Sequence, residues 1–111
     1  MNYKKIKLLI SKFIRERSWK KYHTPKNLSM ALSVEASELL EIFQWVNDKD
    51  FNKNKNFIKA RAQEEIADIF YYLICISEKM NINLEDAIIS KMKKNEQKYP
   101  KHLSKGKFVK R

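Results

Sequence analysis

The scarcity of glycine and proline constrains the fold of this chain more than any other feature. Among 111 residues there are one Gly and two Pro. An all-β chain needs turn residues about every ten positions, whereas a few long helices with short connections need far fewer. Hydrophobic residues make up 43% of the chain and charged residues 33%, a balance typical of one globular domain with one core. We therefore expect residues 1–111 to form a single all-α domain.

Apolar residues recur at three- and four-residue spacing, which is typical of amphipathic helices. Thr24 followed by Pro25 is a helix-start signal, with threonine as the N-cap and proline in the first turn, and Asn83 is a second candidate N-cap. The polar stretch "NDKDFNKNKN" is expected to be a connection, and residues 101–111 a basic, loosely ordered tail. The expected helices span residues 3–19, 25–46, 55–80 and 84–98. This order predicts a four-helix bundle.

The net charge of +11, from 24 Lys and Arg against 13 Asp and Glu, indicates either a polyanionic partner or a lysine-rich composition with solvated faces. The partner would be nucleic acid or a phosphorylated small molecule. Cys75, the single cysteine, lies in the apolar run "IFYYLICI" and is expected in the core of a protein from a reducing compartment. The first residues lack a signal-peptide apolar region, and no stretch has the roughly 18 apolar residues of a membrane span. We expect a cytoplasmic protein.

Acidic residues gather in two short clusters, at 35–41 and 64–68. At about 100° per residue, Glu35 and Glu38 fall inside the apolar arc of the second helix. By the same measure Glu65 and Asp68 fall within the inward stripe of the third helix. Two helices are thus predicted to place a pair of carboxylates, spaced i and i+3, on faces that should be buried. Glu41 and Glu64 fall outside these arcs.

Buried ionised carboxylates are costly unless they are paired or bound to a metal. One interpretation is salt bridges to Lys or Arg, for example to Arg61. Two such pairs on helices that can pack antiparallel favour the metal interpretation. The ligand set contains only oxygens and lacks the Glu-x-x-His repeat of di-iron bundles. Such a site suits Mg²⁺, with Mn²⁺ as the alternative, and Mg²⁺ commonly binds carboxylates together with substrate phosphates.

The motifs together resemble a known family. "WKKYHTPKNLSMALSVEASELLEIFQW", followed by "EEIADIFYYLICISEKMNINLEDAIISKMKKNEQKYP", is similar to the MazG-like, all-α nucleoside triphosphate pyrophosphohydrolases, in the branch that includes dCTP pyrophosphatase. The shared pattern is ExxE, a spacer and ExxD, and it covers about residues 18–100. Two departures stand out. Ala36 and Ser37 occupy positions where the family often has a glycine, and Gln97 replaces an arginine.

The resemblance implies a site and an assembly. It assigns the Mg²⁺ ligands and catalytic carboxylates to Glu35, Glu38, Glu65 and Asp68. It places substrate contacts at Trp19, His23, Trp45, Tyr72, Lys91 and Asn95. It also implies homodimers or homotetramers whose active sites use more than one chain.

The implied reaction is Mg²⁺-dependent hydrolysis of a (deoxy)nucleoside triphosphate, such as dCTP or a modified dNTP, to the monophosphate and pyrophosphate, which would clean the nucleotide pool. Flat indole faces suit base stacking, and the helical angle groups Trp45 with Glu38, although an isolated tryptophan more often belongs to a bundle core. Two other functions stay open. One is a non-enzymatic basic helical protein that binds nucleic acid, which leaves the inward carboxylates unexplained. The other is a purely structural bundle.

Overall fold

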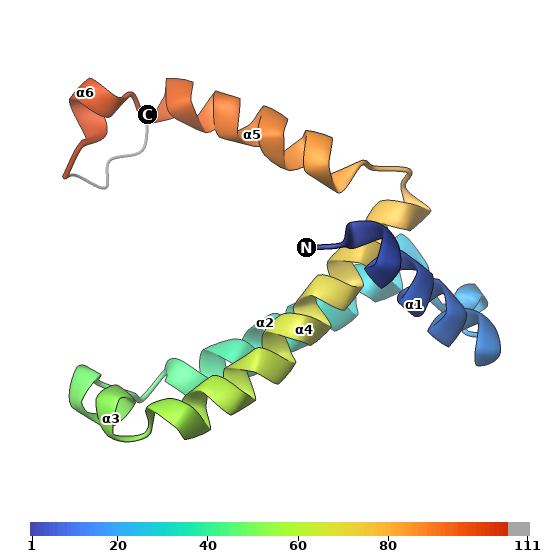
Figure 1. The fold of residues 1–111 in the computed structure, drawn as a ribbon, viewed down its shortest axis with the longest axis horizontal. Helices are drawn as coiled ribbons and strands as arrows, with labels where there is room; N and C mark the ends of the chain where they lie inside the picture. The colour runs from blue at the N-terminus through green and yellow to red at the C-terminus, as the bar shows by residue number, and fades with distance from the viewer. Residues whose placement is uncertain (107–111) are drawn as a thin grey trace. The chain divides into compact units, whose positions relative to one another are not determined.

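The computed structural model describes residues 1–106, and every regular element in that part of the chain is a helix, as the sequence predicts. The chain divides into two compact units, Met1–Met80 and Asn81–Arg111. The first unit contains α1 (Tyr3–Glu16), the 3-10 helix η1 (Lys20–Tyr22), α2 (Pro25–Phe43), α3 (Asp48–Lys53) and α4 (Lys55–Lys79) (Figure 1). The second contains α5 (Leu84–Lys98) and α6 (Lys101–Ser104).

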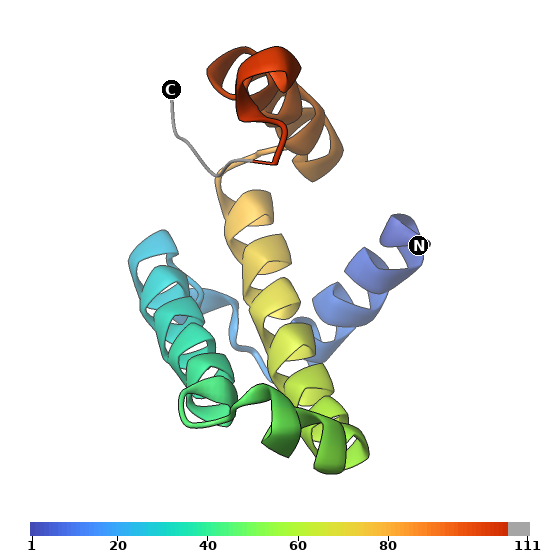
Figure 2. The same ribbon diagram turned by 90° about the vertical axis from the view of Figure 1, so that its left-hand side faces the viewer.

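The two long helices α2 and α4 lie side by side and antiparallel, joined at one end by α3 (Figures 1 and 2). The core between them is built from Ile42, Ile58 and Ala62, with Leu39 and Val46 packed against it. The side chains of Ile42 and Ile58 are only 5% and 6% exposed. Burying such side chains contributes roughly 1.5–3 kcal/mol each, so this contact sets the register of the two helices.

Helix α2 begins as the sequence predicts, because the Thr24 hydroxyl accepts a hydrogen bond from the backbone N–H of Asn27 at 3.2 Å and Pro25 opens the helix. Helix α1 ends at Glu16, three residues before the expected end. The backbone of Ser18 adopts a φ of 52°, in the left-handed region, which stops the helix.

The prediction of a plain connection over "NDKDFNKNKN" is wrong, because six of these residues form α3. The Asn47 side chain caps this helix by accepting from the backbone N–H of Asp50 at 2.8 Å. Asp48 and Asp50 lie in the first turn, where a negative charge is favourable. A short polar helix has no apolar periodicity, so only its cap and its acidic first turn could have indicated it.

Helix α1 is tied to α4 within the first unit. The Lys7 ammonium and the Glu78 carboxylate form an ion pair at 3.0 Å, and the Phe13 and Tyr71 rings meet edge to face at 6.3 Å between centroids. Cys75 is buried, as expected. The gathering of four helices into one bundle stays a prediction, because the fourth expected helix, α5, belongs to the other unit.

The second unit is described by itself. Asn83 caps α5 as predicted, accepting from the backbone N–H of Asp86 at 3.0 Å. Part of the expected tail forms α6, and residues 107–111 lie outside the described residues. None of the helices in residues 1–106 is long and apolar enough to cross a membrane.

Candidate functional site

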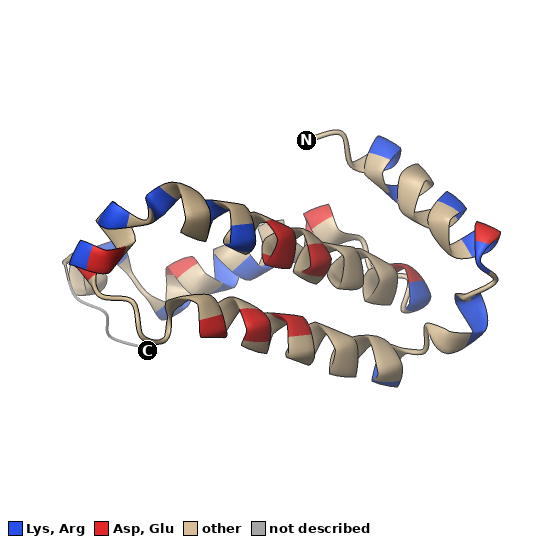
Figure 3. Cartoon of the chain, turned by 90° about the horizontal axis from the view of Figure 1, so that it is seen from below, with Lys and Arg blue, Asp and Glu red and all other residues tan. Residues whose placement is uncertain are grey.

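Three of the four predicted carboxylates meet between α2 and α4. Glu35, Glu38 and Glu65 each offer an oxygen within 4.8 Å of the others, and all three side chains are partly buried. Figure 3 shows acidic positions along both of these helices. The i, i+3 spacing of Glu35 and Glu38 places both on one face of α2, and antiparallel packing brings Glu65 of α4 opposite them. This arrangement confirms the prediction that these three glutamates lie on the facing sides of the two helices.

The carboxylates of this cluster lie close enough to affect one another's ionisation. Repulsion and burial make the charged state of Glu35 unfavourable. The hydrogen bond that protonated Glu35 donates to the Glu65 carboxylate, then burial, and then the Glu38 and Asp68 carboxylates raise the pKa of Glu35 to about 7. One buried carboxylate oxygen, Oε2, of Glu35 and one of Glu65 have no hydrogen-bond partner.

Within residues 1–106, no basic side chain forms an ion pair with the cluster. The ion pair found in this part of the chain joins Lys7 and Glu78, which lie outside the cluster. Arg61, the suggested salt-bridge partner, lies instead over the Phe57 ring at 5.9 Å. Orphaned, buried carboxylate oxygens in an all-oxygen set fit a hard divalent cation such as Mg²⁺ or Mn²⁺.

Asp68, the fourth predicted ligand, is exposed and lies outside the group of three. It remains close enough for its charge to raise the pKa of Glu35 and of Tyr72. Tyr72 is partly buried, and burial, followed by the Glu35 and Asp68 charges, raises its pKa. The structure therefore places Tyr72 beside the carboxylates and Asp68 at their open side.

The two predicted tryptophans differ in their surroundings. Trp19 is 40% exposed and meets the Phe13 ring edge to face at 5.5 Å between centroids. Trp45 is 85% exposed and lies beyond the end of α2 at Phe43. The helical angle that grouped Trp45 with Glu38 therefore does not extend to it. Lys91 and Asn95 lie on α5 in the second unit, with Lys91 exposed and Asn95 partly buried.

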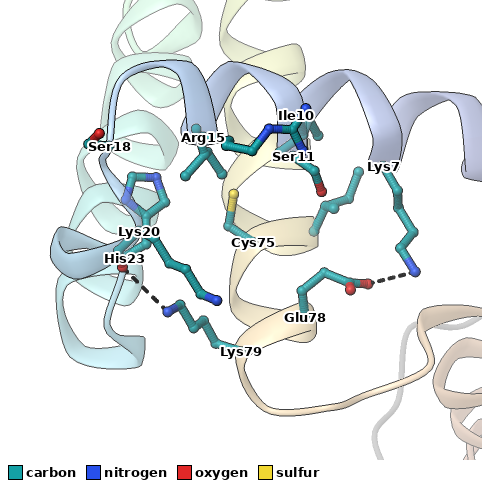
Figure 4. Close-up of a pocket in the computed structure, with 12 residues that line it drawn as sticks. Lys7, Ile10, Ser11, Arg15, Ser18, Lys20, His23, Cys75, Glu78 and Lys79 are labelled. Carbon is teal, nitrogen blue, oxygen red and sulfur yellow. Dashed lines mark hydrogen bonds and ion pairs between the residues drawn. The ribbon is translucent and has the colours of Figure 1, made fainter.

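His23 lines a cavity of about 610 Å³ between α1, η1 and the C-terminal half of α4 (Figure 4). Its apolar wall consists of Ile10, Ile14, Ile74 and Cys75. Its cationic side chains are Lys7, Arg15, Lys20 and Lys79, of which Lys7 is paired with Glu78. The Lys79 ammonium donates to the backbone carbonyl of Lys20 at 3.4 Å, which ties η1 to α4. A partly apolar cavity with several cations suits a ligand that has a flat body and anionic groups.

Tyr71 is a candidate functional residue that the sequence pattern does not indicate. Its hydroxyl lies 3.1 Å from Nε2 of His23, and its ring meets the Tyr72 ring edge to face at 5.1 Å between centroids. On the helical wheel Tyr71 lies about 100° from Tyr72, outside the stripe that led to the other residues. The adjacent "YY" pair was the one available signal.

An all-helical domain that holds a cluster of unneutralised carboxylates between two antiparallel helices belongs to the class of proteins that can hold a divalent cation. The MazG-like family is matched over residues 30–107, so the chain belongs to this family, which confirms the resemblance.

Similarity to individual proteins supports this family membership. The chain is 42% identical over 103 residues to dCTP pyrophosphatase 1 of Mus musculus and 37% identical over 103 residues to that of Homo sapiens. The alignments cover 91% of this chain but 61% of each relative, so the chain spans about three fifths of their length. The crystal structure of a pyrophosphatase from Archaeoglobus fulgidus matches with a TM-score of 0.83 and 41% identity, covering 90% of this chain and 94% of that one.

Proposed function

We propose that this chain is a nucleoside triphosphate pyrophosphohydrolase, which converts a (deoxy)nucleoside triphosphate and water into the monophosphate and pyrophosphate. The observation that carries this proposal is the cluster of Glu35, Glu38 and Glu65 with its buried, unpartnered oxygens. The relatives named dCTP pyrophosphatase 1 and the matched pyrophosphatase structure support it. dCTP or a modified dNTP is the first substrate to test.

Glu35, Glu38 and Glu65 would hold Mg²⁺, or Mn²⁺, with Asp68 available at the open side of the cluster. When bound, such a cation neutralises phosphate oxygens and lowers the pKa of the attacking water. The carboxylates would hold the phosphates only through that cation, because by themselves they repel a polyanion. Binding the cation would also relieve the repulsion among the carboxylates. This double role explains why a basic chain keeps carboxylates together in a partly buried place.

The hydrolysis breaks the bond between the α-phosphorus and its bridging oxygen as the oxygen of water bonds to phosphorus. The proton from water goes to a carboxylate of the cluster or to Glu41, which is exposed one turn along α2 from Glu38. Pyrophosphate is the leaving group. Phosphoryl transfer of this kind depends mainly on positioning and charge stabilisation, which a rigid helix pair provides.

The cavity beside α1 is our candidate for the nucleoside part of the substrate. His23, one of the predicted substrate residues, forms part of its wall. Cys75, also on the wall, follows Asp68 by seven residues, or about 10 Å along α4. The phosphates would extend from the cavity toward the carboxylates. Trp19, Trp45, Tyr72, Lys91 and Asn95 remain proposed further contacts, and a homodimer or homotetramer in the cytoplasm remains the proposed setting.

The test is a screen of common and modified (d)NTPs for pyrophosphate release with Mg²⁺, with Mn²⁺ and with a chelator. Glu38→Gln and Asp68→Asn should each abolish release while circular dichroism shows the fold retained. Glu64→Gln is the matched control, because Glu64 is exposed and outside the cluster. Full activity in Glu38→Gln or Asp68→Asn would refute the site. No release from any nucleotide, with salt-sensitive binding to nucleic acid, would favour the nucleic-acid-binding alternative.

A further inference from the structure

Tyr71 lies between two parts of the proposed site, the cavity wall at His23 and Tyr72 beside the carboxylates. From α4, its hydroxyl reaches Nε2 of His23 in the segment between η1 and α2, at 3.1 Å. Its ring meets the Tyr72 ring at 5.1 Å and the Phe13 ring at 6.3 Å between centroids, both edge to face. Phe13 in turn meets Trp19 at 5.5 Å. Tyr71 thus contacts both His23 in the cavity wall and Tyr72 beside the carboxylates.

The hydroxyl of Tyr71 can also determine which nitrogen of His23 carries the proton. Burial raises the pKa of Tyr71, so the phenol keeps its proton at neutral pH. The Cys75 thiol lies beside the phenol, but an imidazole nitrogen is a better acceptor than a sulfur. If Tyr71 donates to Nε2, neutral His23 must carry its proton on Nδ1. Within residues 1–106 no side chain or backbone group hydrogen-bonds to Nδ1.

We propose that Tyr71 is a positioning residue, whose hydroxyl holds the His23 ring in one orientation and in the Nδ1–H tautomer so that Nδ1–H can donate to an acceptor oxygen or nitrogen of the substrate. This rests on the proposed function and adds to it a residue that acts through His23. The substrate group it serves is a hydrogen-bond acceptor, on the base, the sugar or a phosphate. A histidine with a free ring would lose part of its binding energy to ordering.

Tyr71→Phe tests this role because it removes the hydroxyl and keeps the ring contacts. With dCTP and Mg²⁺, we expect KM to rise about 3- to 10-fold, the worth of one hydrogen bond, and kcat to change less than about twofold. Tyr22→Phe is the matched control, since it removes a tyrosine hydroxyl next to His23 that is exposed and makes no hydrogen bond within residues 1–106. In a His23→Ala background, Tyr71→Phe should have no further effect on KM. An equal KM effect in that background would overturn the proposal.

The tautomer of His23 gives a readout that needs no substrate. The chain has two histidines, so a His102→Gln background leaves only the His23 ring in nitrogen NMR spectra. We expect the Nδ1–H tautomer in the parent and a mixture of tautomers in Tyr71→Phe. Unchanged ring signals, or altered signals with an unchanged KM, would overturn the proposal. If the parent hydrolyses no nucleotide, the proposed function fails, and the ring signals alone then decide whether Tyr71 orients His23.

Discussion

Two polar regions share helix α4 and differ in how their groups are matched. Toward α1, the Glu78 carboxylate is paired with Lys7 at 3.0 Å, and the Tyr71 hydroxyl is hydrogen-bonded to His23 at 3.1 Å. Toward α2, Glu65 faces Glu35 and Glu38, and buried oxygens of Glu35 and Glu65 have no partner. The same helix therefore carries a matched region, whose polar groups have partners within the chain, and an unmatched region, whose carboxylates do not.

This difference indicates which side of α4 requires a bound cation. A buried polar group without a partner costs roughly 1–3 kcal/mol, and more when it is charged. Salt bridges or apolar residues would be the more stable choice for a helix interface. A chain with 24 basic residues does not lack cations to place there. The unmatched region is therefore best explained by a cation and a substrate that complete it, whereas the polar pairs of the matched region fix α1, η1 and the His23 ring on α4.

Glu35→Gln tests the unmatched region most directly and should have the largest effect. Glutamine keeps the shape but removes a cation-binding charge, so we expect pyrophosphate release to fall more than about 100-fold, beyond the 10–100-fold typical of groups that only support metal ligands. The metal-free protein should be as stable as the parent or more so, because a repelling carboxylate is gone. Activity assays and thermal melts in chelator measure the two effects. A stable variant with full activity would show that the unmatched charge has no role in catalysis.

The apolar contact beside the cluster holds the carboxylates together against their repulsion. Ile42→Ala, next to Ile58 and Ala62, should lower the free energy of unfolding by about 2–5 kcal/mol, because it opens a cavity in the core. Leu40→Ala is the control on the same helix, since Leu40 is 65% exposed and should change stability by less than about 0.5 kcal/mol. Urea unfolding followed by circular dichroism measures both. Equal losses would mean that α2 does not bury the face described.

The sequence predicted the helix pair and the three carboxylates that meet between its helices. Periodicity placed Glu35, Glu38 and Glu65 on inward faces, and the turn chemistry of Thr24 and Asn83 gave two helix starts. Both signals are local, so one sequence contains them. Asp68 shows the limit of this method, because an angle on a wheel gives a direction but not the exposure of the side chain, and the structure leaves Asp68 exposed.

The missed features depend on contacts between distant segments or on local polar signals. The hydrogen bond between His23 and Tyr71 joins residues 48 positions apart, and no spacing rule predicts such a pair. The helix α3 forms from polar residues through its cap, without an apolar stripe. Trp45 was grouped with Glu38 because α2 was expected to run to residue 46, and its end at Phe43 removes that argument. Helix ends and tertiary contacts are what the periodic pattern does not contain.

The pH dependence of stability should also distinguish the two regions, because we expect it to arise from the carboxylates of the unmatched region. The pKa of Glu35 in the folded, metal-free protein is about 7, above the ordinary value of 4.5. Between these values the folded state binds more protons than the unfolded state, so stability falls as the pH rises through this window. We expect the melting temperature in chelator to drop by a few degrees from about pH 5 to 8, and Glu35→Gln to flatten this drop. A parent that gains stability over the same range would contradict the crowding of these carboxylates.

The smallest effect is expected in the matched region, from loss of the ion pair between Lys7 and Glu78. Both side chains are substantially exposed, at 39% and 48%, so water and salt screen their attraction. Glu78→Gln, Lys7→Met and the double variant should melt within experimental error of the parent, and added salt should not separate them. A loss as large as that of Ile42→Ala would mean that charge, rather than the aromatic contacts of Phe13 and Tyr71, holds α1 on α4. In that case both sides of α4 would depend on electrostatics. The two regions would then differ only in whether the chain itself supplies the countercharge.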